Sequence, residues 1–177
     1  REPGYINHYS AYYIRNAKSG LYLDLQASGT TNGTHFQQYT FGDPSEVFTL
    51  ISVSTDVYAV KSTFYNAEGR SMVMDGRSNC VAGAQVILYP RVSEAPEQDW
   101  YFRRNDDGTY CISPKKNVYL NLAVEGSSTS NNAKVKLEAR ASSDNQKWYL
   151  EPVSAADFQP KYMFPDPENG VTPYRNV

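Results

Sequence analysis

The chain has 177 residues, a formal net charge of −2 at pH 7, 40% hydrophobic and 20% charged residues, and 15 tyrosines. This length is typical of one medium-sized domain, and the near-neutral charge without a long basic run argues against a nucleic-acid or anionic-membrane partner. No apolar run approaches the roughly 18 residues of a membrane-spanning helix. The many aromatic and uncharged polar residues favour a β-rich domain.

Three segments, taken in chain order, share one pattern: a short alternating strand, a turn containing Gly or Asn, and a second alternating strand. They run over residues 13–25, 58–76 and 110–122, and each predicts a β-hairpin. An acidic or amide residue stands near the end of each hairpin, at Asp24, Asp75 and Asn121.

Each segment then continues in the same way. A polar loop leads to a third predicted strand, over 36–39, 86–89 and 135–138. An aromatic residue follows at Phe48, Trp100 or Trp148, and a further strand begins there. Four strands in each of three repeats predict twelve strands, and no stretch has the apolar spacing of a long helix.

Repeats this short cannot each bury an apolar face, so they must share a core and close around an axis. The sequence therefore predicts an all-β fold, a β-trefoil with pseudo-threefold symmetry. We expect the trefoil over residues 11–153, with repeats at about 11–56, 57–107 and 108–153. Residues 1–10 are expected to form an N-terminal arm. The Pro-rich residues 154–177 are either a linker to a further domain or a tail whose aromatics pack on the trefoil.

The repeated aromatic residues belong to a short motif. Residues 98–100 and 146–148 share the pattern Gln-x-Trp, and residues 46–48 read Glu-Val-Phe. With the hairpins before them, these motifs resemble the ricin B-chain type lectins, also known as ricin-type carbohydrate-binding modules. The resemblance implies a domain that binds carbohydrate without catalysis, needs no metal or cofactor, and often forms part of a larger secreted protein. A start at Arg1 rather than Met is compatible with such an origin.

The motif aromatics are expected in a shared core rather than at a ligand, because apolar residues alternate around them. Gln98 and Gln146 are expected to bond loop backbone, since a buried amide needs partners. The predicted core consists of Leu21, Leu23, Phe36, Phe48, Met72, Met74, Val86, Trp100, Val118, Leu120, Val135 and Trp148.

Galactose-like sugars have an apolar face that stacks on an aromatic ring and hydroxyls that bond carboxylates and amides. In ricin-type lectins the hairpin Asp is the acceptor and the third strand supplies the ring. The resemblance therefore assigns a first site to Asp24, Gln37 and Tyr39, with His35 as a weaker neighbour. It assigns a second site to Asp75 and Tyr89, where Ile87 replaces the amide.

The third repeat departs from this pattern. The resemblance aligns Asn121 with the hairpin Asp and Glu138 with the ring. Asn121 cannot supply a charged acceptor and Glu138 cannot stack on a sugar, so we expect this site to be lost. An Asn beside the motif glutamine also assists in the family. The third repeat keeps it as Asn145, whereas Ser45 and Glu97 stand there in the other repeats.

The function expected is binding of a glycan with galactose or N-acetylgalactosamine. Two alternatives stay open: a module for a plant polysaccharide such as xylan, and a trefoil scaffold for protein–protein contact. A hairpin Asp can also simply cap the next turn. An enzyme is not expected, because no catalytic motif is present. A thiol site built from Cys80 and Cys111 with His8 and His35 has no local support, and the pairing of the two cysteines stays open.

Overall fold

The computed structural model describes residues 6–7, 10–154, 163–164 and 172–173. Twelve strands build the three predicted repeats, which confirms the all-β prediction. They are, in the first repeat, β1 Ser10–Asn16, β2 Tyr22–Leu25, β3 Phe36–Tyr39 and β4 Val47–Ser54; in the second, β5 Val57–Tyr65, β6 Ser71–Asp75, β7 Ile87–Pro90 and β8 Trp100–Arg104; and in the third, β9 Tyr110–Pro114, β10 Leu120–Val124, β11 Val135–Ala139 and β12 Trp148–Pro152.

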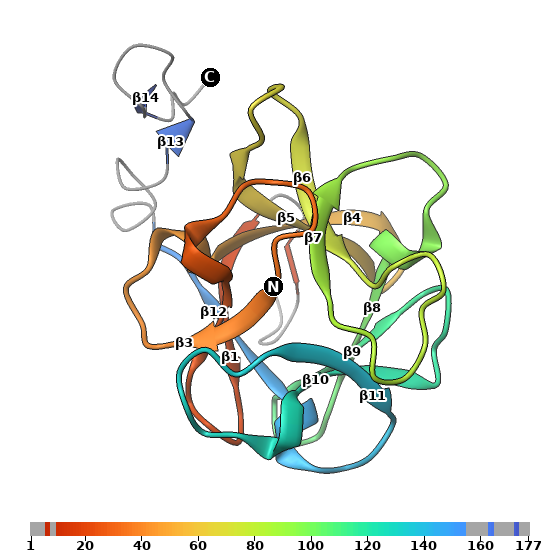
Figure 1. Ribbon diagram of the computed structural model, residues 1–177. Helices are drawn as coiled ribbons and strands as arrows, with labels where there is room; N and C mark the ends of the chain where they lie inside the picture. The colour runs from red at the N-terminus through yellow and green to blue at the C-terminus, as the bar shows by residue number, and fades with distance from the viewer. Residues whose placement is uncertain (1–5, 8–9, 155–162, 165–171, 174–177) are drawn as a thin grey trace.

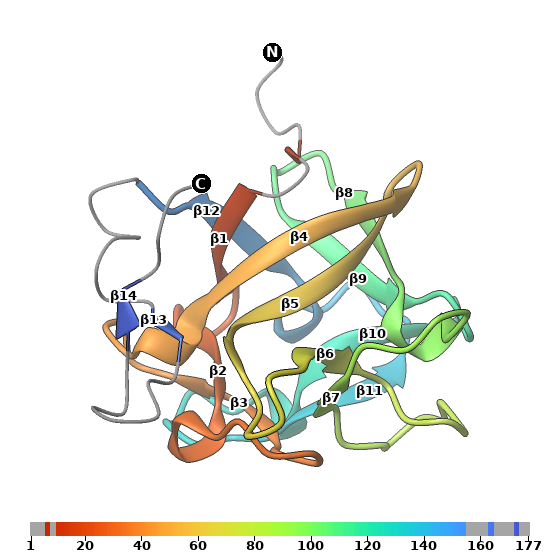
Figure 2. The same ribbon diagram turned by 90° about the horizontal axis from the view of Figure 1, so that it is seen from above.

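Six of these strands close into a barrel. Antiparallel ladders join β1 to β4, β4 to β5, β5 to β8, β8 to β9, β9 to β12 and β12 back to β1. The remaining strands pair as β2–β3, β6–β7 and β10–β11. Figure 1 shows these pairs arranged around a central axis, and Figure 2 shows them as a layer below the barrel. This is the arrangement of a β-trefoil, in which closure leaves the barrel without a free edge.

Hydrogen bonds between the three pairs define which residues are equivalent. Leu88 N–H donates to Thr34 O, Leu137 N–H to Ala84 O, and Gln38 N–H to Ala133 O, over 2.8 to 3.0 Å. Residues 38, 88 and 137 therefore occupy one position of the pseudo-threefold fold. This frame allows each site residue to be compared across the repeats.

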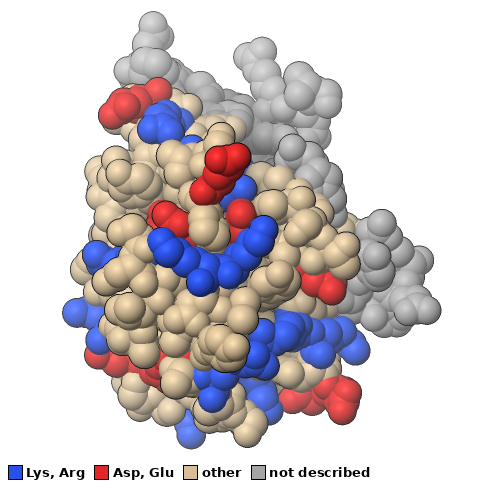
Figure 3. All heavy atoms as spheres, turned by 90° about the vertical axis from the view of Figure 1, so that its right-hand side faces the viewer, with Lys and Arg blue, Asp and Glu red and all other residues tan. Residues whose placement is uncertain are grey.

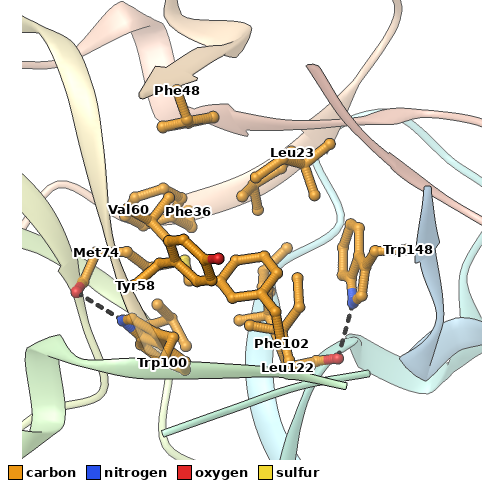
Figure 4. Close-up of a cluster of buried hydrophobic side chains, with 14 of the residues drawn as sticks. Leu23, Phe36, Phe48, Tyr58, Val60, Met74, Trp100, Phe102, Leu122 and Trp148 are labelled. Atoms are coloured by element: carbon orange, nitrogen blue, oxygen red, sulfur yellow. Dashed lines mark hydrogen bonds between the residues drawn. The ribbon is translucent and has the colours of Figure 1, made fainter. Parts of the chain in front are cut away.

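The core lies where the three repeats meet. Trp100 and Trp148 are fully buried, and each indole N–H donates to a strand carbonyl, of Met74 and Leu122 respectively (Figure 4). Phe48 takes the equivalent place in the first repeat. Ten of the twelve predicted core residues are buried, whereas Leu21 and Val118 are only half-buried. The prediction is wrong for these two because each lies in the turn just before the second strand of its hairpin.

The hairpins differ more than their sequences indicate. β1 pairs with β2 only at Arg15 and Tyr22, and β5 pairs with β6 at two positions. Among the described residues, no ladder joins β9 to β10. Instead, Ser113 Oγ donates to Asn121 Oδ1 over 2.8 Å. β9 ends at Pro114, which has no N–H to give to a ladder.

Both ends of the chain fall largely outside the described residues. Ser10, expected in the N-terminal arm, already belongs to β1. In the predicted tail, β13 Met163–Phe164 pairs with β14 Thr172–Pro173. Cα atoms of β13 come within 8 Å of those of β5. The tail residues Phe158, Tyr162 and Tyr174 lie outside the described residues.

Candidate functional site

The hairpin carboxylate of the first repeat is buried. Asp24 lies near the end of β2 and its side chain is 1% exposed. Its Oδ1 accepts a hydrogen bond of 2.5 Å from Ser45 Oγ, and its Oδ2 accepts one of 3.0 Å from Gln37 Nε2. Burial raises the pKa of Asp24, while these two hydrogen bonds oppose the rise. The carboxylate thus holds the side chains of Ser45 and Gln37 in place through hydrogen bonds.

A pocket of about 470 Å³ lies beside Gln37. Predicted residues Gln37, Tyr39 and His35 line it, and the Tyr39 side chain is 36% exposed. Asp24 does not line this pocket, so its expected contact with a sugar stays a prediction. The lining also includes residues that the sequence reasoning missed, namely Gln26, Ala27, Phe36, Asp43, Gln85, Asn132 and Lys134.

Several of the missed residues reach the pocket from other repeats. The backbone of Gln37 pairs with that of Lys134 in an isolated antiparallel β-bridge, and Asn132 N–H donates to Gln38 O over 2.9 Å. These contacts join segments about a hundred residues apart in sequence. Nothing in the local pattern indicates them, and only the threefold closure brings them together. Asp43 lies nearer in sequence, and its Oδ1 accepts from Ser45 N–H over 3.1 Å.

His35 is a half-buried imidazole at the pocket wall. Burial lowers its pKa, and the charges of Lys134 and Arg77 lower it further. A neutral imidazole has one donor and one acceptor nitrogen. His35 can therefore offer either to a hydroxyl near neutral pH.

The second repeat holds its carboxylate differently. Asp75 Oδ2 accepts from Gln98 Nε2 over 3.0 Å, and Oδ1 accepts from Arg77 N–H over 2.6 Å. Burial raises the pKa of Asp75. Ile87 lies across the ladder from it and contributes no polar atom. Tyr89 is 42% exposed, so the predicted ring is accessible.

The third repeat corrects one prediction. Asp24 lies across from Gln37 and Asp75 across from Ile87, but Ala123 lies across from the equivalent residue Lys136. The hairpin Asp is thus replaced by Ala123, not by Asn121. The assignment of the hairpin Asp position to Asn121 was shifted by two residues, because Asn121 is the only amide near the end of that hairpin.

Asn121 and Asn145 have structural partners. Asn121 lies opposite Glu138; its Oδ1 accepts from Ser113 and Arg103, and its Nδ2 donates to Gln146 Oε1 over 2.8 Å. Asn145 Nδ2 donates to Val124 O over 3.0 Å. With Ala123 at the carboxylate position, the third repeat lacks the acceptor that the family resemblance requires.

The motif glutamines behave as predicted. Gln98 accepts from Val92 N–H and donates to Pro90 O, and Gln146 accepts from Ala141 N–H and donates to Ala139 O. Glu46 takes their place in the first repeat. Its Oε1 accepts from Gly42 and Asp43 N–H, but its buried Oε2 has no partner. Burial raises the pKa of Glu46 to about 8.

Other kinds of site find little support in the described part of the chain. Cys80 and Cys111 are both free thiols, and burial raises the pKa of Cys80 to about 11. His8, considered with them, lies outside the described residues. No cluster of three or more His, Cys, Asp or Glu side chains that could hold a metal occurs among the described residues. None of the described helices has the length and apolar character needed to cross a membrane.

Charge is distributed in mixed groups on the face shown in Figure 3. Lys and Arg side chains gather in an arc and in a second group below it, and acidic side chains adjoin both. On this face the two signs interrupt each other.

Solved structures with the same fold include a designed protein with threefold symmetry, ThreeFoil, at 26% identity and a TM-score of 0.71, covering 81% of this chain and 99% of that one. An exo-β-1,3-galactanase from Clostridium thermocellum matches at 26% identity and a TM-score of 0.70, over 84% of this chain but only 31% of its own. The C-half of an earthworm R-type lectin in complex with GalNAc matches at 15% identity and a TM-score of 0.62, over 81% and 99%.

No curated protein sequence gives a significant match. The family model of the ricin-type β-trefoil lectin domain-like proteins matches residues 5–89, 63–138 and 96–160, three overlapping matches that together include all three repeats. These matches together extend over more than half of the chain and agree with the barrel, the three strand pairs and the buried motif residues. The chain therefore belongs to the ricin-type β-trefoil lectin domain-like family.

Proposed function

We propose that this chain is a non-catalytic carbohydrate-binding domain whose main site is the first-repeat pocket. Its ligand is a saccharide with terminal galactose or N-acetylgalactosamine. The observation that carries the proposal is the pairing of an accessible ring, Tyr39, with an amide, Gln37, that the buried Asp24 holds in place.

Each lining group has a role in this proposal. The Tyr39 ring stacks on the apolar face of the sugar, as aromatic side chains do in saccharide sites. Gln37 and Asp43 bond the hydroxyls at the edge of the sugar, and Asp43 brings a charged acceptor to the pocket. Asp24 acts as a positioning residue, because it is buried, does not line the pocket and accepts a hydrogen bond from the pocket residue Gln37.

The compared structures support a galactose-type ligand. The earthworm lectin was solved with GalNAc, and the bacterial enzyme is an exo-β-1,3-galactanase. The match extends over less than a third of that enzyme, which supports a role for this chain as a targeting module in a larger secreted protein. A single shallow site binds a sugar weakly, so a second weak site on the same rigid body raises the avidity for a polyvalent glycan.

The second repeat is the weaker site in this proposal. Tyr89 offers a ring, but Ile87 offers no amide, and Asp75 is bonded to Gln98 and Arg77. We therefore expect its affinity to be lower than that of the first repeat. The third repeat, with Ala123 and Glu138 at the acceptor and ring positions, does not bind in this way.

A glycan array with the intact chain and two matched variants tests the proposal. Tyr39→Ala removes the ring of the first site, and Tyr89→Ala removes the ring of the second. We expect binding to terminal galactose or GalNAc, a loss of about tenfold or more with Tyr39→Ala, and a smaller loss with Tyr89→Ala. Binding to xylan-type polymers alone would identify the ligand as a plant polysaccharide and contradict the proposed galactose-type ligand. No binding to any glycan by the folded parent would refute the proposal and direct attention to protein partners.

A further inference from the structure

A second polar pocket, of about 560 Å³, lies in the third repeat, away from the residues equivalent to the proposed sugar site. The β8–β9 hairpin and the loop after β11 form its walls. Three basic side chains line it, Arg103, Arg140 and Lys147, together with the carboxylates of Asp106 and Asp107 and the amides of Asn105 and Asn121, so basic groups are in excess by one. No aromatic ring is among its lining residues, so stacking cannot drive binding here.

Arg103 is half-buried in this pocket without an acidic partner. Its Nη2 donates to Ser113 Oγ over 2.9 Å and to Asn121 Oδ1 over 3.0 Å, both neutral acceptors. No carboxylate of the described residues comes within 4.0 Å of its guanidinium nitrogens. Burial lowers the pKa of Arg103 and the charge of Arg140 lowers it further, while the neighbouring Cys111 thiol opposes both effects. A positive charge in such a place is costly unless an anion accompanies it.

The other two repeats show which partners the residue equivalent to Arg140 has. Phe41, Arg91 and Arg140 are equivalent, because the N–H of the next residue donates in each case to the motif side chain, Glu46, Gln98 or Gln146. In the first repeat Phe41 packs on Tyr13 and Tyr22, with ring centroids 4.9 and 5.2 Å away.

In the second repeat Arg91 forms an ion pair of 2.9 Å with Asp99, the middle residue of the motif. In the third repeat the middle residue is Lys147. The position that supplies a counter-charge to Arg91 therefore supplies a like charge near Arg140. Lys147 has exposed acidic neighbours of its own, Asp144 at 3.6 Å and Asp107 at 3.9 Å, but Arg140 and Arg103 have none among the described residues.

We propose that this third-repeat pocket binds the anionic group of an acidic sugar, a carboxylate or a sulfate ester, between Arg103 and Arg140. Guanidinium groups bind such anions through two parallel hydrogen bonds. The side chains of Asn105 and Ser142 bond the neighbouring hydroxyls. That the ligand is a sugar rests on the proposed function, whereas the demand for an anion rests on the pocket alone.

Isothermal titration of the full chain with matched sugars tests this inference. The first pair is methyl β-glucuronide and methyl β-glucoside, which differ by a carboxylate; the second is galactose 6-sulfate and galactose. Each is titrated into the Tyr39→Ala variant, so that the first-repeat site does not contribute. We expect at least one acidic sugar to bind about tenfold more tightly than its neutral partner.

Two variants locate the binding. Arg140→Gln should weaken the acidic sugar about tenfold, whereas Arg104→Gln, which removes the same charge from the neighbouring exposed residue outside the pocket, should change it less than twofold. Equal losses with both variants would show general charge attraction and overturn the inference. So would equal binding of acidic and neutral sugars, or sodium sulfate binding as tightly as the acidic sugars. If the parent does not bind galactose but still binds the acidic sugar, only the first-repeat site is refuted.

Discussion

Gln37 Nε2 donates a hydrogen bond of 3.0 Å to Oδ2 of Asp24, directly across the β2–β3 ladder. The other oxygen of Asp24 accepts from Ser45, so the carboxylate is fixed from two sides. In the second repeat Ile87 stands opposite Asp75, and that carboxylate bonds Gln98 instead. The same hairpin Asp therefore orients a pocket residue in one repeat and braces the loop before β8 in another.

Replacing Asp24 separates its positioning role from its structural role. Asp24→Asn can keep its oxygen toward Gln37 Nε2 and donate from its amide nitrogen to Ser45 Oγ, so Gln37 stays in place through a neutral bond; we expect galactose binding within about threefold of the parent and a modest loss of stability. Asp24→Ala leaves the buried Gln37 amide without its acceptor and free to rotate, and should weaken galactose binding about tenfold and lower the free energy of unfolding by about 1–3 kcal/mol. Calorimetric titration and urea unfolding measure the two effects. Asp75→Ala is the control, and parent-like affinity in Asp24→Ala would show that Asp24 does not orient the site.

Glu46 should make stability depend on pH. The structure raises its pKa from 4.5 to about 8. The folded state therefore holds this proton more tightly than the unfolded state, and the contribution of Glu46 to stability falls as pH rises from about 4.5 through 8. Glu46→Gln removes this dependence and gives the unpartnered oxygen position an amide that can donate, as Gln98 and Gln146 do.

The expected result is a variant that is more stable than the parent above pH 8, by about 1–3 kcal/mol, with a smaller difference near pH 5. Urea unfolding of both proteins at the two pH values measures it. Because Asp24 and Asp75 also titrate, the comparison uses the difference between variant and parent. A difference that stays constant with pH would mean that Glu46 is ionised in the folded protein throughout this range.

The repeat pattern was sufficient to predict the trefoil and most of its core. Alternating apolar residues and three registered aromatics are local signals, and the barrel follows from them because only closure buries their shared face. The family resemblance assigned Gln37 and Tyr39 to the first-repeat site, and both residues line one pocket.

The rest depended on information that one strand does not carry. Asn132 and Lys134 come to the first-repeat pocket from the third repeat through the threefold closure. The register of the third hairpin was wrong by two residues, because side chains two apart point to the same side and either Asn121 or Ala123 suits the alternation. The counter-charge that Asp99 supplies to Arg91 likewise becomes visible only when the repeats are compared in space.

Trp148→Phe tests how much the buried indole hydrogen bond contributes. The indole N–H donates to Leu122 O over 3.0 Å, whereas Phe48 occupies the equivalent core position with no such donor. The ring can therefore be accommodated, and the loss is the bond together with a small cavity. We expect the free energy of unfolding to fall by about 1–3 kcal/mol, with the fold retained. Thermal unfolding and circular dichroism measure it, and a parent-like stability would show that the carbonyl finds another donor.

Tyr39 supplies a ring and a hydroxyl, and two variants separate them. If the ring stacks on the sugar, Tyr39→Phe keeps the stacking surface and should change the galactose affinity by less than about threefold. Tyr39→Ala removes it and should weaken binding about tenfold or more. Because the side chain is more than a third exposed, neither change should lower stability by much more than about 0.5 kcal/mol. Titration of both variants with galactose decides the question: equal losses would assign the binding energy to the hydroxyl, and stacking would then not explain the site.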